Sequence, residues 1–491
     1  MLTEESHRFH LARIRRLSLP LAWFLLSAPT ACSSDEAGNA DGRTRASSIR
    51  EVAERLLRDS ASPAEATEDL DQVDKGHRDR SPFVTVQGTN LRLRGQPYRY
   101  VGANYWQAMN LASRGPGGDR AQLLRELDDL KAHGITNLRI MAASEGPDTE
   151  PLRIVPSLLK APGVYDEDLL DGLDFVLKAM RDRDMKAIMT MGNMWHWSGG
   201  LGQYLVWAGV ADAIPYPPPR PGGDWDEYQR FAAQFYGNPD AVFHYLSHVA
   251  KIVTRYNRYT RTRYRDEPAI MAWELGNEPR ALDQVDAYLD WVAVSSWFIK
   301  ALDRRHLVTI GSEGDTSSPD YSGTEYSRDH SIDTIDYGTA HVWVQNWGWY
   351  DPMRAEETYD PALALAKAYI DSHVDRTVQL DKPIVFEEFG LARDANNFDP
   401  TSSLVWRDRY YGEFFAHLLG HAQEERVAGV NFWAFAGESR PLPPFGLWWE
   451  AGDPFTGDPP HELQGWYSVY DTDASTLAVV SQYSELFGDL E

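Results

Sequence analysis

The sequence predicts a (β/α)8 barrel, in which eight parallel strands close on themselves inside a ring of helices. Two observations lead to this fold class. Eight short, mainly apolar runs recur between Tyr98 and Phe435, and long amphipathic segments separate most of them. Apolar strands that alternate with helices indicate a parallel sheet covered on its outer face. Eight such units are the number that closes a barrel.

The elements follow from hydrophobic periodicity. The strand-like runs read YRYVGAN, TNLRIMA, KAIMTMG, AIMAWEL, HLVTIGS, YGTAHVW, PIVFEEF and GVNFWAF. Helices are predicted over 120–134, 165–184, 288–305 and 406–425, and a closing helix over 475–487, from apolar residues that recur at the helical period. A β-hairpin over 83–97, with Gly-containing turns, is expected to precede the first run.

Residues 1–32 have the pattern of an export signal. Arg13, Arg15 and Arg16 directly precede an apolar run over 17–28 that is too short for a stable membrane-spanning helix. Cys32 is the only cysteine of the chain, so no disulfide can form within it. It stands where a bacterial lipoprotein signal is cut, although Pro29 takes the place of the usual Leu. Cys32 is therefore the predicted lipidation site, and the alternative is an ordinary secretory signal.

The remainder divides into a spacer and one large domain. Residues 33–80 are polar and poor in aromatics, which is typical of a spacer, with one short helix expected at 49–57. The catalytic domain is expected over 81–491. The formal net charge of −25 argues against a nucleic-acid partner because phosphates would be repelled.

One predicted connection is unusually long. It covers 193–226 and contains four tryptophans. Long connections in compact domains are usually functional or disordered. We therefore expect this one to form a wall of a cleft.

Carboxylates and tryptophans recur at the carboxyl ends of the predicted strands, where barrel enzymes place their active sites. The residues at these ends are Arg139, Trp195, His196, Asn277, Glu278, Glu313, His341, Trp343, Glu387, Glu388 and Trp433. Glu278 ends the fourth run and Glu388 the seventh, so the two can face each other across the barrel mouth. Paired carboxylates suit glycosidic-bond cleavage, and tryptophans suit the apolar face of a sugar ring.

Other chemistries find little support. His244 and His248 lie four residues apart, but Tyr245 stands where a zinc-protease motif needs Glu. The sequence contains no Gly-rich phosphate loop after a strand and no nucleophile-elbow serine. No cofactor and no metal are expected.

At this point the motifs resemble glycoside hydrolase family 5, in the clan of retaining (β/α)8 enzymes. Asn277-Glu278-Pro279 is similar to its acid/base signature and Glu388-Phe389-Gly390 to its nucleophile signature. The stretches FYGNPDAVFHY, NMWHWSGG, GSEG and HVWVQNWGWYDP resemble the endo-β-1,4-mannanase branch in particular. The resemblance covers about Phe83 to Phe487.

The resemblance implies a role for each matching residue. Glu278 would be the general acid/base and Glu388 the nucleophile, held ionised by Arg139. Asn277 would bind the sugar 2-hydroxyl. The other implied contacts are His341 beside the nucleophile, Trp433 as the stacking platform under the reacting sugar, and Asn193, Trp195 and Glu313 as further substrate contacts.

One position departs from the family pattern. Trp343 stands where many members have a tyrosine whose hydroxyl touches the nucleophile. An indole cannot accept a hydrogen bond as that hydroxyl does, so the residue that supports Glu388 stays open. The neighbouring Glu387 is expected to point between strand and helix, because side chains alternate along a strand.

The sequence thus predicts an exported, retaining endo-β-1,4-mannanase with a β-mannan polysaccharide or oligosaccharide as its substrate. It is expected at the bacterial cell surface or in the periplasm, anchored through Cys32, or else secreted. A β-1,4-glucanase and an exo-acting enzyme that releases mannan oligosaccharides are alternatives. A non-catalytic sugar-binding lipoprotein is an alternative of another class, which Glu278 and Glu388 together disfavour. Endo or exo action, the preferred mannan and the oligomeric state stay open.

Overall fold

The computed structural model describes residues 48–59, 81–316 and 322–490. Each predicted apolar run contains one strand of an eight-stranded sheet with the order β10-β9-β8-β5-β4-β13-β12-β11, all paired in parallel. The strands are β4 (Tyr100–Asn104), β5 (Asn137–Met141), β8 (Lys186–Thr190), β9 (Ile270–Glu274), β10 (Leu307–Thr309), β11 (Gly338–Val342), β12 (Ile384–Phe389) and β13 (Gly429–Phe432).

The two end strands of this order, β10 and β11, lie next to each other. The backbone N–H of Asp336 donates to the carbonyl of Val308 at 2.8 Å, and that of His341 donates to the carbonyl of Glu313 at 3.0 Å. These bonds join the segments that flank the two strands, so the sheet is nearly closed into a barrel. The predicted fold class is confirmed.

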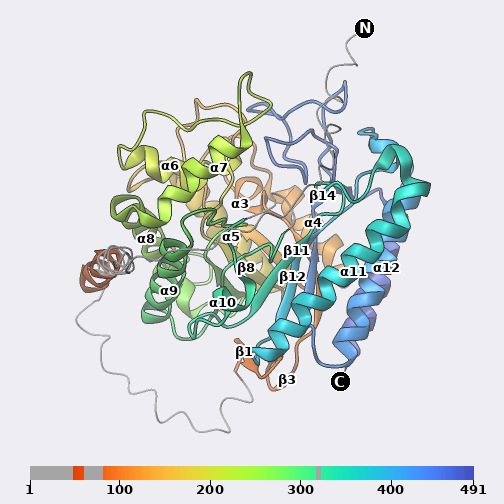
Figure 1. The fold of residues 1–491 in the computed structure, drawn as a ribbon, viewed down its shortest axis with the longest axis horizontal. Coiled ribbons are helices and arrows are strands. Elements are labelled where there is room, and N and C mark those ends of the chain that lie inside the picture. Colours follow the sequence, from red (N-terminus) through yellow and green to blue (C-terminus); the bar gives the residue numbers. More distant parts are fainter. Residues whose placement is uncertain (1–47, 60–80, 317–321, 491) are drawn as a thin grey trace, which may run out of the picture. The chain divides into compact units, whose positions relative to one another are not determined.

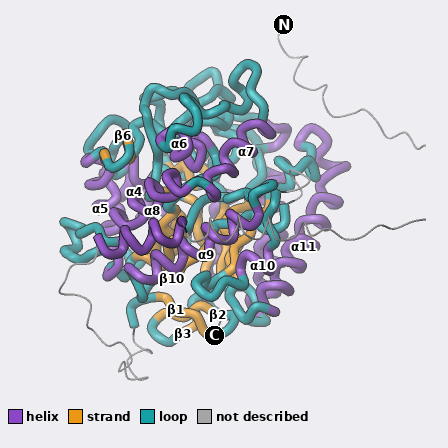
Figure 2. Tube along the Cα trace, turned by 60° about the vertical axis from the view of Figure 1, so that its left-hand side comes forward, coloured by secondary structure: helices purple, strands orange, loops and turns teal. Residues whose placement is uncertain are grey.

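Helices surround the strands on the outside, as Figure 2 shows. They are α3 (Ala108–Leu111), α4 (Arg120–Ala132), α5 (Glu167–Asp182), α6 (Gly200–Trp207), α7 (Trp225–Ala233), α8 (Pro239–Val253), α9 (Val285–Leu302), α10 (Tyr326–His330), α11 (Ala355–Gln379), α12 (Val405–Gln423) and α13 (Ala474–Gly488). Helices α4, α5, α9, α12 and α13 occupy the five predicted helical segments. Residues 48–59 are also helical, where a short helix was expected.

The N-terminal end of the barrel is closed by a small antiparallel sheet. It consists of β1 (Val84–Gln87), β2 (Asn90–Leu93) and β3 (Gln96–Pro97), at the bottom of Figure 1. Val84 and Leu91 bury their side chains against Tyr100 and Tyr337 at the base of the barrel interior. The predicted hairpin therefore shields the lower barrel from water.

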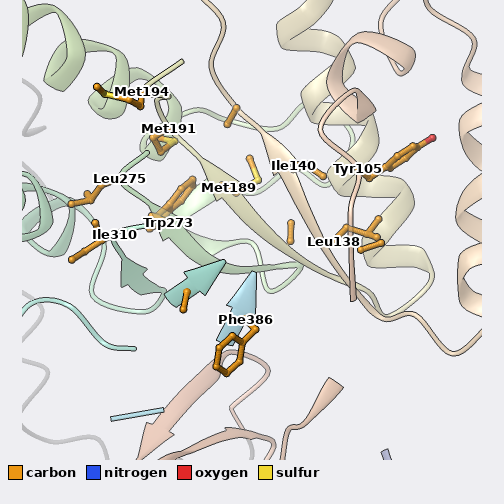
Figure 3. Close-up of a cluster of buried hydrophobic side chains, with 14 of the residues drawn as sticks. Tyr105, Leu138, Ile140, Met189, Met191, Met194, Trp273, Leu275, Ile310 and Phe386 are labelled. Atoms are coloured by element: carbon orange, nitrogen blue, oxygen red, sulfur yellow. The ribbon is translucent and has the colours of Figure 1, made fainter. Parts of the chain in front are cut away.

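The main hydrophobic core lies between the strands and the helices. It includes Leu138 on β5, Met189 on β8 and Trp273 on β9, none of them exposed to solvent (Figure 3). The predicted strands are mainly apolar because this outer face and the lower interior face are both buried. This closely packed core supports the polar side chains at the barrel mouth.

Two long segments lie at the carboxyl ends of the strands, at the upper end of the molecule in Figure 1. The first follows β8 and contains α6 and the start of α7. The second, residues 438–468, runs between the paired short strands β14 (Phe435–Gly437) and β15 (Val469–Tyr470). A short antiparallel hairpin, β6 (Leu159–Ala161) with β7 (Val164–Tyr165), follows β5.

Strand β12 contains a bulge at the two adjacent glutamates. Ala340 of β11 pairs with Phe386 and the next residue, His341, pairs with Glu388, so Glu387 is an extra residue in the ladder. Phe386 and Phe389 both pack in the outer core. The extra residue suspends the alternation of side chains, which lets Glu387 and Glu388 both turn inward.

The expectation that Glu387 points between strand and helix is therefore wrong. Its carboxyl oxygen Oε1 accepts a hydrogen bond from the hydroxyl of Tyr337 at 3.2 Å, and Oε2 lies 3.9 Å from Nε of Arg139. Tyr337 belongs to the lower barrel interior. Alternation failed as a guide because it assumes an unbroken ladder.

Among the described residues, no helix has the length and apolarity needed to cross a membrane. Cys32 and the rest of the predicted signal and most of the spacer lie outside the described residues.

Candidate active site

Arg139 is the centre of a polar network inside the upper barrel. This residue lies on β5, and its buried guanidinium donates to both carboxylate oxygens of Glu274, at 2.6 and 2.7 Å. It also donates to Oδ1 of Asn277 at 2.7 Å, Oδ1 of Asn104 at 3.1 Å and Oε1 of Glu388 at 2.5 Å. A planar, fully charged donor of this kind fixes several acceptors at once.

Glu388 is the carboxylate that the network presents toward the mouth. Its side chain is only 3% exposed, and Arg139 binds one of its oxygens. The other oxygen, Oε2, accepts a hydrogen bond from Nε1 of Trp343 at 3.1 Å and lies 3.4 Å from Nδ1 of His341. The structure thus answers the question that Trp343 raised. The indole N–H of Trp343 donates a hydrogen bond to Glu388, at the position where the usual family pattern has a tyrosine hydroxyl.

Glu278 faces Glu388 from the loop after β9. Its Oε2 accepts a hydrogen bond from Nε1 of Trp195 at 2.5 Å, and its Oε1 lies 2.7 Å from Nδ1 of His341. One oxygen of Glu278, one oxygen of Glu388 and a ring nitrogen of His341 all lie within 4.8 Å of one another. Residues that are far apart in the sequence therefore converge at the barrel mouth.

Burial controls the protonation of this pair. Burial raises the pKa of Glu278, against the opposing charge of Arg280 and the hydrogen bond from Trp195. Burial also raises the pKa of Glu388, and repulsion from Glu278 adds to it, whereas Arg139 opposes both effects. Two carboxyl groups this close cannot both ionise readily, so the pair binds one proton in common.

His341 is neutral at physiological pH. Burial lowers the pKa of His341 to about 3, with a further contribution from the charge of Arg139. Its Nε2 atom is buried and has no hydrogen-bond partner among the described residues. A neutral imidazole that carries its proton at Nε2 can accept a hydrogen bond at Nδ1 from a protonated Glu278.

The amides of Asn277 and Asn193 form a chain beside the acidic pair. Asn277 donates to Oδ1 of Asn193 at 3.2 Å, and the same oxygen accepts from the backbone N–H of Trp195 at 3.1 Å. Asn193 is fully buried, whereas Asn277 is 3% exposed. Asn193 therefore positions its neighbours, and Asn277 lies at the pocket surface.

Glu313 is engaged by Arg280 in a two-pronged ion pair, with N–O distances of 2.7 and 2.8 Å. The Arg280 guanidinium also lies over the ring of Trp195, at 4.8 Å from its centre. Both Glu313 oxygens are thus occupied within the protein. The geometry favours a positioning role for Glu313, through Arg280 and Trp195, over direct contact with substrate.

Trp433 follows β13 and forms one wall of a pocket. Its ring meets that of Trp343 edge to face, with centres 6.2 Å apart, and its Nε1 is buried without a hydrogen-bond partner among the described residues. The pocket is narrow and opens to solvent. It is lined by Asn104, Trp106, Arg139, Ile140, Met141, Thr190, Trp197, Asn277 and Trp433. Aromatic walls with a few polar groups suit a sugar ring.

Several residues of the site were not singled out from the sequence. Trp106 donates from Nε1 to the carbonyl of Gly457 at 2.9 Å, which ties segment 438–468 to the loop after β4. The ring of His461 stacks on that of Trp197, with centres 6.3 Å apart. Glu462 has a raised pKa because of burial and the nearby charges of Asp458 and Glu278. Only the position of Trp106 directly after a strand is a signal in the sequence.

The trio of Glu278, His341 and Glu388 has the donor types of a metal site. The guanidinium of Arg139, 2.5 Å from Glu388, already supplies a positive charge there. A dication would be repelled by that charge, so the arrangement suits acid–base and nucleophilic chemistry better than metal binding.

Comparisons with known proteins agree with this geometry. Residues 81–490 match the model of a family described as glycoside hydrolase family 5, β-mannosidase-like. A mannan endo-1,4-β-mannosidase from Solanum lycopersicum is 32% identical over 369 residues, which are 70% of this chain and 85% of that protein.

Solved structures give the same result. A glycoside hydrolase family 5 mannosidase from Rhizomucor miehei is 37% identical, with a TM-score of 0.76, over 83% of this chain and 98% of that one. An endo-β-1,4-mannanase from Thermotoga petrophila, 22% identical with a TM-score of 0.59 over 80% of this chain and 78% of that one, shares the fold. With the family model, these likenesses show that the chain belongs to glycoside hydrolase family 5, among its β-mannosidase-like members.

Proposed function

We propose that this protein is a retaining endo-β-1,4-mannanase, which cleaves β-1,4-mannosidic bonds by double displacement. The observation that carries the mechanism is the approach of Glu278 and Glu388, whose nearest oxygens lie within 4.8 Å. Retaining glycosidases hold their carboxyl groups about 5 to 5.5 Å apart, whereas inverting enzymes leave about 6.5 to 9.5 Å for a water molecule.

The shared proton resides on Glu278 in this proposal. Arg139 and Trp343 both donate to Glu388, which favours its ionised form. A protonated Glu278 donates from Oε1 to Nδ1 of neutral His341 and still accepts from Trp195 at Oε2. Every short contact of the pair is then a complete hydrogen bond.

Chemistry follows in two steps. The Glu388 carboxylate attacks the anomeric carbon as the bond to the leaving oxygen breaks, and Glu278 gives its proton to that oxygen. Water then loses a proton to Glu278 and attacks the same carbon, which releases Glu388. Each step inverts the carbon, so the net result is retention.

The relatives support mannan as the substrate. The proteins from Solanum lycopersicum carry the name mannan endo-1,4-β-mannosidase, and a Rhizomucor miehei family member, 36% identical over 83% of this chain, has been solved in complex with mannosyl-fructose. On this chain, Asn277 and Trp433 line the pocket and are the groups we assign to the 2-hydroxyl and the ring face of the reacting sugar.

One observation favours exo action as a second candidate. An endo-acting enzyme needs a cleft open at both ends, so that a polymer can pass through. Here segment 438–468 contacts Trp106 after β4 and Trp197 after β8, two strands that β5 separates. Glu278 and Glu388 are only 7% and 3% exposed. A mouth this covered suits release of short products from a chain end.

We further propose export and anchoring through Cys32. The support is the sequence alone, in which the sole cysteine follows an export signal and precedes a polar spacer. The spacer would hold the barrel away from the bilayer.

The test is hydrolysis of mannohexaose followed by NMR. A β-anomer as the first-formed product is expected, and an α-anomer would contradict the double-displacement mechanism. Chain lengths released over time from linear mannan, glucomannan, galactomannan and carboxymethyl cellulose separate the remaining alternatives. Internal cleavage yields mixed lengths early, exo action yields one short product, and cleavage of the cellulose derivative alone indicates a glucanase.

A further inference from the structure

A second cluster of metal-ligating side chains lies outside the barrel, between α11 and α12. His417 and His421 stand one turn apart on α12, so their rings project from the same face. Asp371 on α11 faces both rings. Its Oδ1 atom lies 2.7 Å from Nε2 of His417 and 2.7 Å from Nε2 of His421, and the three atoms all lie within 4.8 Å of one another.

This cluster differs from the other charged contacts between the two helices. Those contacts use arginine or lysine, which has no lone pair to offer a metal at neutral pH. They are Asp360 with Arg409 and Glu413 with Lys367, and Asp375 of α11 pairs with Arg426 just after the end of α12. Asp371 alone among them receives two imidazoles on one oxygen. Two ring nitrogens and one carboxylate oxygen, each able to bind a metal, therefore gather at one place between the two helices.

We propose that His417, His421 and Asp371 bind a divalent transition metal, with Zn²⁺ as the ion that two imidazoles and a carboxylate suit best. Zinc is held tetrahedrally by nitrogen at about 2.0 to 2.1 Å and oxygen at about 2.0 to 2.2 Å, which separates neighbouring ligand atoms by roughly 3.3 Å. The carboxylate oxygen would therefore move away from each ring by about half an ångström.

The site has room for that adjustment. The side chains of His417, His421 and Asp371 are 24%, 13% and 49% exposed, so the cluster opens toward solvent and water can complete the coordination. The rings meet edge to face with centres 5.1 Å apart, and both Nε2 atoms approach the same Oδ1 atom of Asp371.

One neighbouring charge opposes a cation. Arg426 lies with Nη1 at 3.5 Å from Nδ1 of His421. Its guanidinium is paired with Asp375 and, at 3.6 Å, with Glu424. Two carboxylates therefore offset the one arginine, and Asp371 adds a further negative charge at the site itself.

The position indicates a structural role. Asp371, His417 and His421 lie in the carboxyl-terminal parts of α11 and α12. Barrel helices run opposite to the strands, so these ends lie beside the amino-terminal ends of the strands, away from the mouth. A bound ion would link two neighbouring helices, which run side by side in Figure 1, and would stabilise the folded state by mass action.

The experiment is calorimetric titration of ZnCl₂ into the full chain, after treatment with a chelator and dialysis. The variants are His417→Gln, His421→Gln and Asp371→Asn, which keep polar side chains at the interface. We expect the unaltered chain to bind one equivalent and to melt at a higher temperature with zinc. Each variant should lose both responses while melting near the unaltered chain without zinc.

His133→Gln is the matched control. His133 also pairs with a carboxylate one helical turn away, Asp129 at 3.6 Å, but without a second histidine. This variant should bind zinc as the unaltered chain does. Failure of the unaltered chain to bind would overturn the site. Equal binding by the His417→Gln/His421→Gln double variant would also overturn it, by assigning the ion elsewhere, for example to Glu278, His341 and Glu388. Retention of configuration on mannohexaose is independent of either result.

Discussion

Glu387 and Glu388 are adjacent in the chain and both point into the barrel, yet they contact different residues. Glu388 lies 2.5 Å from Arg139, whereas Glu387 lies 3.9 Å from it and otherwise meets the hydroxyl of Tyr337. Burial raises the pKa of Glu387 well above its usual range, and the charge of Glu274 adds to this. Since one guanidinium cannot neutralise three carboxylates, we expect Glu387 to be protonated at neutral pH.

The two glutamates should therefore respond differently to amidation. Glu388→Gln removes the nucleophile, so we expect kcat to fall by about three orders of magnitude or more. Glu387→Gln replaces a neutral carboxylic acid by a neutral amide of the same shape, so kcat and melting temperature should change little. Steady-state kinetics on mannohexaose and thermal unfolding of both variants measure this.

Rescue by azide is a second test of the roles of Glu388 and Glu387. Glu388→Ala leaves a space on the side from which the nucleophile attacks, so added azide should partly restore cleavage and yield a glycosyl azide. Rescue of Glu387→Ala instead, with Glu388→Ala merely unstable, would show that the roles are reversed.

Trp195 contributes, after burial and the charge of Arg280, to the pKa of Glu278 and so to the upper pH limit of activity in this mechanism. Its indole N–H stabilises the ionised form of Glu278 and so lowers the pKa of that carboxyl. Trp195→Phe removes the donor and keeps an aromatic ring, so the pKa of Glu278 should rise. Activity requires protonated Glu278, and its alkaline limb should therefore move to higher pH in a profile of kcat/KM. An alkaline limb that stays in place or moves to lower pH would argue against Glu278 as the acid.

At the scale of elements, the loops after the strands divide the work between packing and chemistry. Trp433 follows β13 and lines the pocket beside Arg139 and Asn277. Trp207 ends α6 in the long loop after β8, packs on the main core, and meets Tyr204 with ring centres 5.5 Å apart. Trp433 thus faces the site, whereas Trp207 packs against the core that supports its own loop.

Alanine substitutions should separate these two roles. Trp433→Ala should lower kcat about tenfold or more, which corresponds to roughly 1.4 kcal/mol of transition-state stabilisation. Trp207→Ala should lower the melting temperature and leave kcat nearly unchanged, because it removes packing and no substrate contact. Equal kinetic losses in both variants, measured on mannohexaose, would remove the basis for this ranking.

At the scale of the whole molecule, the sequence places a predicted export signal, residues 1–32, before the barrel domain. If Cys32 carries a lipid anchor, the unaltered protein should sediment with membranes from the expressing bacterium. Cys32→Ala should then release active enzyme into the soluble fraction or leave the signal uncut. Immunoblotting of the membrane and soluble fractions measures this. A variant that is cleaved normally and still sediments with membranes would contradict the anchor.

Much of the fold was predictable because strands that are buried on both faces consist mainly of apolar residues. Strands such as Ile270–Glu274 and helices such as Glu167–Asp182 follow from local periodicity. The pairing of Glu278 with Glu388 was also predictable, since parallel strands end at one edge of a barrel. The partners of Glu313 and the cover that segment 438–468 forms were not, because contacts between loops leave no periodic pattern.

The sequence by itself determined the barrel, the two carboxylates at its mouth and the family resemblance that names their roles. Only the tertiary structure decided that Glu387 turns inward, since a bulge is a property of two paired strands and not of one. It also decided that Trp343 supports Glu388 by donating and that Asp371 meets two histidines between α11 and α12. These contacts join residues far apart in the chain, and their geometry exists only once the strands and helices have closed around them.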